Sequence, residues 1–247
     1  MRRLCSGVLV ALTATQAAGC IISSNGDGGD GEIGLIEANW DIRTLANNTA
    51  LNCPAGFDTA AVIAKRLDAA QNDIVDLFDC ADFNGLSEYP PGEYQLFVQI
   101  ESRSGGNVYG KSLSTIVDIT FADDAFDTIL LDDAGYFQFD FELVDAVTRA
   151  PLSCTAAGAE KIQIKSTPAG GTTAKTDQFN CEDGAGITNA LLAGSYTIDV
   201  TALDLTDRPL GAAQTQANRT IEDRNEVTDL TPGGGGPAAI VLAIDRN

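Results

Sequence analysis

Hydrophobic and polar residues alternate with a period of two along several stretches of this chain. The stretches are residues 36–42, 94–98, 137–143, 196–200 and 240–244. Alternation over five to eight residues is typical of a β-strand that buries one face. Trp40 shares its phase with Ile36 and Ile42, so we expect it in a core rather than exposed for stacking on a sugar ring. The pattern predicts an all-β protein.

The same landmarks recur about 101 residues apart. The pairs Cys53/Cys80 and Cys154/Cys181 both have a spacing of 27 residues, and the two pairs are offset by 101. Other matched positions are Gly34 and Gly135, Trp40 and Phe141, Phe78 and Phe179, Gly85 and Gly186, Tyr94 and Tyr196, and Gly110 and Gly211. Self-similarity at a fixed period is the signature of repeated structural units. We therefore predict two similar domains, at residues 34–134 and 135–247.

The junction between the two repeats is predicted to be short. Gly34, Gly135 and Gly236 open three related segments, so Ile240, Leu242 and Ile244 take the places of Phe139, Phe141 and Leu143. On this interpretation residues 137–143 end the first domain and begin the second, or follow its last strand closely.

One segment, residues 59–70, has an ambiguous pattern. Its residues are good helix formers, and several apolar ones have helical spacing. Its counterpart in the second repeat, residues 161–165, alternates clearly as a strand. Because similar sequences share folds, we predict a strand for residues 60–66.

The N-terminus carries an export pattern. Residues 1–20 read MRRLCSGVLVALTATQAAGC: a basic start, an apolar run too short to span a bilayer, then small residues before Cys20. This resembles a bacterial lipoprotein signal with its lipobox. The resemblance implies removal of residues 1–19, a diacylglycerol on the Cys20 sulfur and an acylated amino group. Ile21, where an Asp would retain the protein in the inner membrane, implies the outer membrane. The alternative is an ordinary secretory signal cut near Ala18 or Gly19.

Residues 20–33 are predicted to be a flexible tether, because Ser23–Glu32 reads SSNGDGGDGE and is poor in apolar residues. A calcium loop is the alternative, since Asp27, Asp30 and Glu32 are interleaved with glycine. The full EF-hand spacing is absent.

Six cysteines resolve into three groups. Cys5 leaves with the signal and Cys20 takes lipid, which leaves four for pairing. The repeat favours Cys53–Cys80 and Cys154–Cys181, one disulfide per domain, since pairing across domains does not explain the shared spacing. An exported location permits oxidation. A thiolate metal site is the rival, but it requires CxxC spacing, which is absent.

Composition excludes several classes of function. The chain has no histidine, so a Ser-His-Asp triad, a Cys-His dyad and an imidazole metal site are impossible. No lysine has a serine three residues before it, so SxxK is absent. Fifteen Lys+Arg against 35 Asp+Glu give a formal charge of −20, which argues against binding nucleic acid. Loss of Arg2 and Arg3 with the signal makes the mature charge −22. We predict no enzyme activity and no cofactor.

Two stretches suggest a fold family. Leu192–Ile198 and Tyr89–Leu96 each place a turn, a glycine and a buried tyrosine before an alternating strand. They resemble the LPxGxYxLxV signature of carboxypeptidase-regulatory-like and Cna-B-like domains. Residues 141–152 resemble that family's opening strand and turn. The resemblance implies tandem immunoglobulin-like, prealbumin-type β-sandwiches of the kind found in Gram-negative lipoproteins, and it says nothing about function.

Acidic residues suggest two alternative functions. A calcium-dependent adhesion module is one hypothesis, because acidic residues cluster at Asp123, Asp124 and Asp127 and again at Asp132 and Asp133. Solvated loops explain these clusters as well. A facing acid pair in a cleft would indicate a carbohydrate-active enzyme. We favour a non-enzymatic lipoprotein anchored to the membrane through Cys20, with a structural, protein-binding or glycan-binding role.

Overall fold

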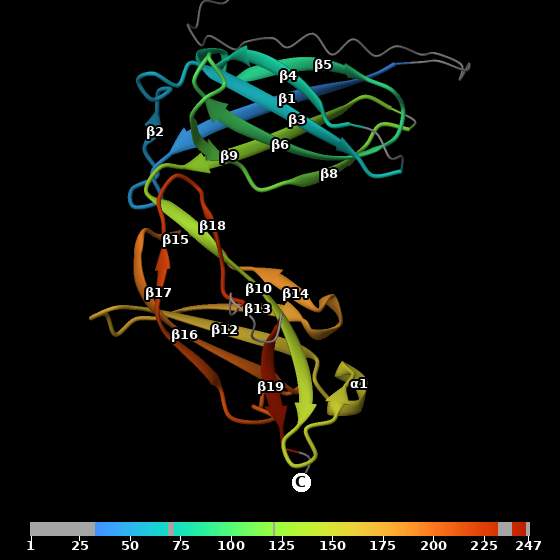
Figure 1. Ribbon diagram of the computed structural model, residues 1–247, viewed down its shortest axis with the longest axis vertical. Helices are drawn as coiled ribbons and strands as arrows, with labels where there is room; N and C mark the ends of the chain where they lie inside the picture. The colour runs from blue at the N-terminus through green and yellow to red at the C-terminus, as the bar shows by residue number, and fades with distance from the viewer. Residues whose placement is uncertain (1–32, 69–71, 121, 232–238, 246–247) are drawn as a thin grey trace, which may run out of the picture. The chain divides into compact units, whose positions relative to one another are not determined.

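The alternating stretches form the strands of two immunoglobulin-like β-sandwiches in tandem. The protein is described by a computed structural model that covers residues 33–68, 72–120, 122–231 and 239–245 (Figure 1). Residues 33–247 form one compact unit, which contains two separate clusters of buried hydrophobic side chains, one in each sandwich. Nearly all regular structure is β, as the sequence predicts.

The first sandwich packs two sheets around a core that includes Trp40, which is 3% exposed. In one sheet, β1 pairs with β2, β5 and β9; in the other, β6 pairs with β3, β7 and β8, and β4 lies at the edge beside β3. The first sheet consists of β1 (Gly34–Arg43), β2 (Ala50–Leu51), β5 (Asn84–Tyr89) and β9 (Asp124–Leu131). The second consists of β3 (Thr59–Arg66), β4 (Ile74–Asp79), β6 (Glu93–Glu101), β7 (Val108–Lys111) and β8 (Thr115–Asp118).

The second sandwich repeats this arrangement around β10, with Phe137, Phe139 and Phe141 buried as a stripe. The sheet around β10 contains β10 (Ala134–Asp145), β11 (Pro151–Leu152), β14 (Ala185–Ile187), β15 (Leu191–Leu192), β18 (Val227–Asp229) and β19 (Ile240–Ile244). The facing sheet contains β12 (Lys161–Pro168), β13 (Lys175–Asn180), β16 (Gly194–Leu203) and β17 (Gln214–Ile221). The short helices are η1 (Cys80–Asp82), α1 (Cys154–Ala157) and η2 (Cys181–Asp183).

Each sandwich is closed by a strand that runs parallel to its first strand. In the first sandwich β9 pairs with β1, from Ile36 beside Asp124 to Arg43 beside Leu131. In the second, β18 and β19 share this role and pair with successive parts of β10. The closing role is therefore divided in the second repeat between β18, which ends at Asp229, and β19, which begins at Ile240, whereas β9 fills it alone in the first.

The expectation that residues 137–143 end the first domain is wrong. Strand β10 packs in the second core, and β9 closes the first sandwich. Ile240 is the parallel pairing partner of Phe141 rather than the equivalent of Phe139. Periodicity alone does not separate these cases, because a first strand and the strand that closes on it have the same alternation. Instead, the first strand of the second sandwich closely follows the last strand of the first: β9 ends at Leu131 and β10 begins at Ala134.

The ambiguous segment is a strand, as the repeat predicts. Strand β3 runs from Thr59 to Arg66 and pairs with β4 and β6. Burial between these two neighbours overrides the helix preference of its alanines.

The tyrosine of the shared signature has the same role in both sandwiches. The Tyr94 hydroxyl donates to the carbonyl of Pro90 at 2.7 Å, and the Tyr196 hydroxyl donates to the carbonyl of Leu192 at 2.8 Å. Each ring lies in the core while its hydroxyl holds the preceding turn, which is the usual arrangement for a buried tyrosine.

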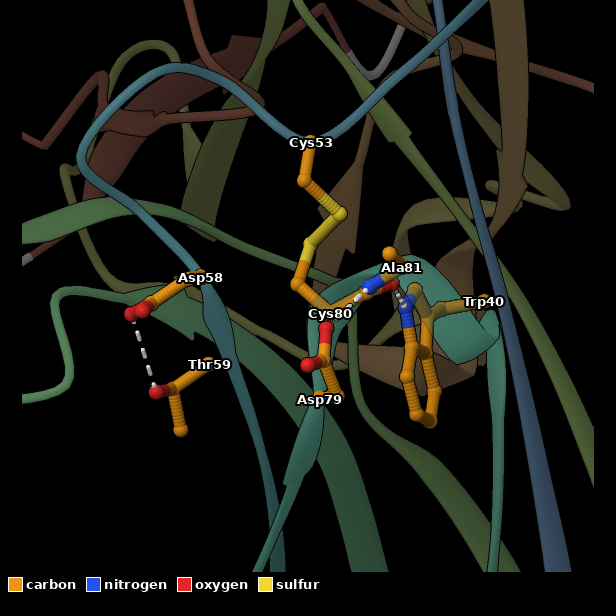
Figure 2. Close-up of a disulfide and its surroundings, with 7 residues drawn as sticks. All are labelled: Trp40, Cys53, Asp58, Thr59, Asp79, Cys80 and Ala81. Carbon is orange, nitrogen blue, oxygen red and sulfur yellow. Dashed lines mark hydrogen bonds between the residues drawn. A yellow bond between two sulfur atoms is a disulfide. The ribbon is translucent and has the colours of Figure 1, made fainter.

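Both predicted disulfides are present. Cys53 is bonded to Cys80 with a Cα–Cα distance of 6.0 Å, and Cys154 to Cys181 with 5.8 Å. Figure 2 shows the first one beside Trp40, whose Nε1 donates to the Cys80 carbonyl at 3.0 Å. The Asp79 carboxylate accepts from the backbone N–H of Ala81 and caps the short helix that begins at Cys80. The first disulfide therefore ties a loop to a capped turn, and the second ties helix α1 to the capped turn at η2.

Candidate functional site

Two acidic residues join the sandwiches, and both are held by hydrogen bonds from each side. The backbone N–H of Asp132 donates to the carbonyl of Arg43 at 2.8 Å, and its own carbonyl accepts from the N–H of Arg224 at 3.0 Å. The Asp133 carboxylate accepts from the N–H groups of Leu45 and Ala46. A linker bonded to both neighbours at each residue leaves little freedom for hinge motion.

Asn225 is the central residue of this junction. It belongs to the turn between β17 and β18, is 2% exposed and has φ of +64°. Its Nδ2 donates to the carbonyl of Lys111 at 2.9 Å, and its Oδ1 accepts from the N–H of Leu131 at 3.0 Å and from the Tyr136 hydroxyl at 3.3 Å. Its backbone N–H donates to the carbonyl of Ala134 at 2.8 Å. One buried side chain thus ties both sandwiches together.

The repeat landmark Gly110 packs directly against that turn. A Cβ at Gly110 would lie 2.6 Å from the backbone oxygen of Arg224, closer than real Cβ contacts. This close approach leaves no room for a side chain at position 110, which explains why the residue is glycine. The same turn places the Arg224 guanidinium 5.2 Å from the centre of the Tyr109 ring, and the Tyr109 hydroxyl donates to the Asp132 carboxylate. Burial first, and this hydrogen bond second, raise the pKa of Tyr109 well above its usual value.

A groove of about 650 Å³ opens beside the junction, with walls from both sandwiches. The first sandwich contributes residues of β6, β7 and the loop that follows; the second contributes residues 223–227 and parts of β10 and β14. Lys111 places its Nζ 3.4 Å from the centre of the Phe97 ring, and burial lowers its pKa. Side chains and backbone groups that line the groove include Gln95, Phe97, Tyr109, Lys111, Ser114, Gln138, Ile187 and Arg224.

This groove is suited to binding. It combines two aromatic rings, amide groups, hydroxyls and two cations, and each cation lies over one of the rings. Its two acidic residues, Asp223 and Glu226, lie on one turn, and Asp223 is 3.9 Å from the Arg224 guanidinium.

The acidic residues singled out as calcium ligands are dispersed. The Asp123 carboxylate accepts from the N–H of Leu35 at 2.8 Å, and the Asp127 carboxylate accepts from Asn39 Nδ2 at 3.0 Å. Asp124 accepts from the N–H of Ala125, while Asp132 and Asp133 serve the junction. Among the residues that the structure describes, no three acidic or cysteine side chains gather closely enough to hold a metal ion. The calcium-dependent hypothesis stays a prediction.

The export and anchoring predictions concern residues that the structure does not describe. The signal at residues 1–19, Cys20, and the acidic residues Asp27, Asp30 and Glu32 lie outside the described ranges. Within those ranges, no helix has the length and apolarity needed to cross a membrane.

Sequence reasoning did not identify the junction residues Tyr109, Arg224 and Asn225. The repeat marks Gly110 as a landmark, but sequence alone does not say which segment approaches it. That information comes from the contact between segments more than 100 residues apart.

Comparison with known proteins finds structural similarity only. No protein-family model matches the chain, and no curated protein is similar to it in sequence. A leucine-rich repeat protein from Bacteroides thetaiotaomicron is similar with a TM-score of 0.40 at 13% identity, over 86% of this chain and 26% of the other. The Bacillus anthracis TIE protein has a TM-score of 0.27 at 12% identity, over 85% and 34%. The chain thus spans between a quarter and about a third of these two proteins.

The fimbrial anchor protein Mfa2 from Porphyromonas gingivalis is matched over more of its length. Its TM-score is 0.27 at 15% identity, over 75% of this chain and 82% of that one. Similarity at this level does not say what the present chain binds.

Proposed function

We propose that the protein is an exported, lipid-anchored and non-enzymatic binding protein of the outer membrane. It displays two disulfide-bonded sandwiches at a fixed mutual orientation, and the groove between them receives a protein or glycan partner. The observation that carries the proposal is the groove itself, whose two walls belong to different sandwiches and are held together through Asn225.

The junction supports a binding role because it preorganises the groove. Hydrogen bonds at Asp132, Asp133 and Asn225 fix the two walls before any ligand arrives. A preformed site loses less conformational entropy on binding than one that must be assembled. Two disulfides support the same role in an oxidising compartment, because they stabilise small domains without a large core.

The lining of the groove supports a glycan or an extended peptide as the ligand class. Gln95 and Gln138 offer amide donors and acceptors, and Lys111, whose ammonium lies over the Phe97 ring, offers a cation. Sugars and peptide backbones both present hydroxyl or amide groups that hydrogen-bond to such a lining.

The test is an array of bacterial and host glycans and of peptides, probed with the chain from residue 20 onward. Ile187 lines the groove and is 40% exposed, whereas Leu192 is 42% exposed and does not line it. Ile187→Arg fills the groove with a long charged side chain and is expected to abolish binding. Leu192→Arg is the matched control and is expected to bind as the wild type does. Binding that survives Ile187→Arg, or no binding to any probe, contradicts the proposal.

The anchor is supported by the sequence before Cys20. Two or more acyl chains hold a protein durably at a bilayer, whereas one chain does so only marginally. The formal charge of −22 on the mature chain keeps the sandwiches away from anionic lipid, so the anchor alone provides attachment.

A further inference from the structure

Strand β9 is an edge strand whose outer side lacks a partner strand. Among the strands of the described residues, it pairs with β1 alone. The N–H of Asp132 donates to the last residue of β1, whereas the N–H of the residue before it, Leu131, donates to the Asn225 side chain. Backbone groups alternate between the two sides of a strand, so those of Asp127 and Ile129 point away from β1, as those of Leu131 do. This edge therefore offers a row of N–H and C=O groups at strand spacing.

A hollow of about 530 Å³, which we call the β9 hollow, lies along this part of the strand. Its lining includes residues 127–129 of β9, residues 39–41 of β1, Tyr136 of the second sandwich and Leu113. Leu113 also lines the groove described above, so the groove and the β9 hollow adjoin at this side chain. A ligand that occupies the groove and continues past Leu113 therefore reaches the open edge of β9.

The side chains in the β9 hollow define what a ligand at this edge must present. Ile129 is 50% exposed and offers an apolar surface. Asp127 lies two residues before it on the same face, accepts from Asn39 Nδ2 and forms no ion pair with any residue that the structure describes. The other acid of the lining, Asp41, is paired with Arg43. A basic and an apolar side chain two residues apart on a neighbouring strand complement Asp127 and Ile129.

We propose that the ligand of the groove is an extended polypeptide segment that adds as a strand to the free edge of β9. It carries a basic side chain beside Asp127 and an apolar one beside Ile129. This inference rests on the proposed function, and it names one ligand class where the groove alone leaves glycan and peptide open. A peptide backbone matches the N–H and C=O groups of β9 at their own spacing, which a chain of sugar rings does not. The formal charge of −22 on the mature chain favours a basic segment over a second copy of this chain.

A library of random peptides about twelve residues long, which extend over about 40 Å, tests the ligand class beside an array of glycans. Both are probed with the chain from residue 20 onward that carries Cys20→Ser. We expect hits among the peptides, and these hits share a basic and an apolar residue two positions apart. Hits among the glycans alone overturn this inference and leave the binding role of the groove standing. No hit of either kind contradicts the groove proposal and this inference together.

Two variants test the place of binding. Ile129→Arg puts a cation beside Asp127 and is expected to weaken binding of the peptide hits at least about tenfold. Leu86 is 60% exposed on β5, at the opposite edge of the same sheet, and lines neither the groove nor the β9 hollow. Leu86→Arg adds the same charge there, and this matched control is expected to bind as the wild type does. Circular dichroism confirms that both variants are folded. Peptide binding that is lost in Ile187→Arg but survives Ile129→Arg overturns the edge site and leaves the groove proposal standing.

Backbone methylation of a peptide hit tests strand addition itself. In an added strand every second N–H faces β9 and the others face away. Around the basic and apolar pair, N-methylation is therefore expected to weaken binding at alternate positions only, by at least about tenfold at each. Equal losses at neighbouring positions, or no loss at any position, overturn the proposal.

Discussion

Asn225 donates a hydrogen bond from Nδ2 to the backbone carbonyl of Lys111 at 2.9 Å, across the boundary between the two sandwiches. Its Oδ1 accepts from the N–H of Leu131 at the same time. The Asn225 side chain is buried, whereas both of its bonds to the first sandwich are partly buried. The mutual orientation of the sandwiches therefore depends on this one side chain more than on any charge pair at the surface.

Asn225→Ala is expected to destabilise the protein and to uncouple the sandwiches. The variant removes two partly buried hydrogen bonds to the first sandwich and the bond from the Tyr136 hydroxyl, which costs about 1–3 kcal/mol of unfolding free energy. Denaturant unfolding measures the loss, and we expect one cooperative transition to become two. Asn218→Ala is the control, because Asn218 also has positive φ, at +56°, but its side chain is exposed. An equal loss in both variants would assign the effect to backbone conformation and contradict this role.

Removal of either disulfide is expected to cost about 3–4 kcal/mol of unfolding free energy, since each bond closes a loop of similar length. Cys53→Ala with Cys80→Ala lowers the stability of the first sandwich, and Cys154→Ala with Cys181→Ala that of the second. Denaturant unfolding of the two double variants measures both losses. Thiol titration of the denatured chain from residue 20, carrying Cys20→Ser, is expected to detect no free thiol. Four reactive thiols would refute the disulfides.

Stability is expected to fall in strongly alkaline solution. Burial raises the pKa of all five tyrosines above the ordinary value of 10.0. A raised pKa in the folded state means that the stabilisation is fully present below pH 10 and is lost as the pH rises above it, because the unfolded chain releases those protons first. Tyrosinate absorbance measured during alkaline titration is expected to appear only together with unfolding. Tyrosinate formation while the protein stays folded would be inconsistent with this burial.

Calcium is expected to leave the melting temperature unchanged. The Asp123 and Asp133 carboxylates already accept from backbone N–H groups, and Asp127 from an amide. Thermal unfolding with millimolar calcium, compared with chelator, measures the effect; magnesium controls for ionic strength. A rise in melting temperature specific to calcium would restore the calcium-dependent adhesion hypothesis.

The repeat made most of the fold predictable from sequence. The shared offset of Cys53 and Cys154 predicted the strand at residues 60–66 against its helical composition, and it predicted both disulfides. The alternation around Trp40 predicted its burial. These features depend on local pattern and on similarity between the two halves, which a single sequence contains.

The features of the candidate site were harder to predict from sequence because they depend on contacts between distant segments. The role of Asn225 follows from its position against Lys111, and an isolated asparagine in a polar turn does not indicate it. The apolar row of Ile63, Val75 and Phe97 on one sheet also emerges only from strand register. The same limit explains the error at residues 137–143, where pairing partners and equivalent strands share one alternation.

Membrane-anchored display is the central claim of this account, and intact mass spectrometry of the protein isolated from its native membrane tests it most directly. The account predicts a chain that begins at Cys20, carries the added mass of acyl chains and diacylglycerol, and lacks the four hydrogens of two disulfides. Cys20→Ser should remove the added mass and release the protein from the membrane fraction. A mature chain that begins at Cys20 without acyl mass, or that begins at another residue, would contradict the account.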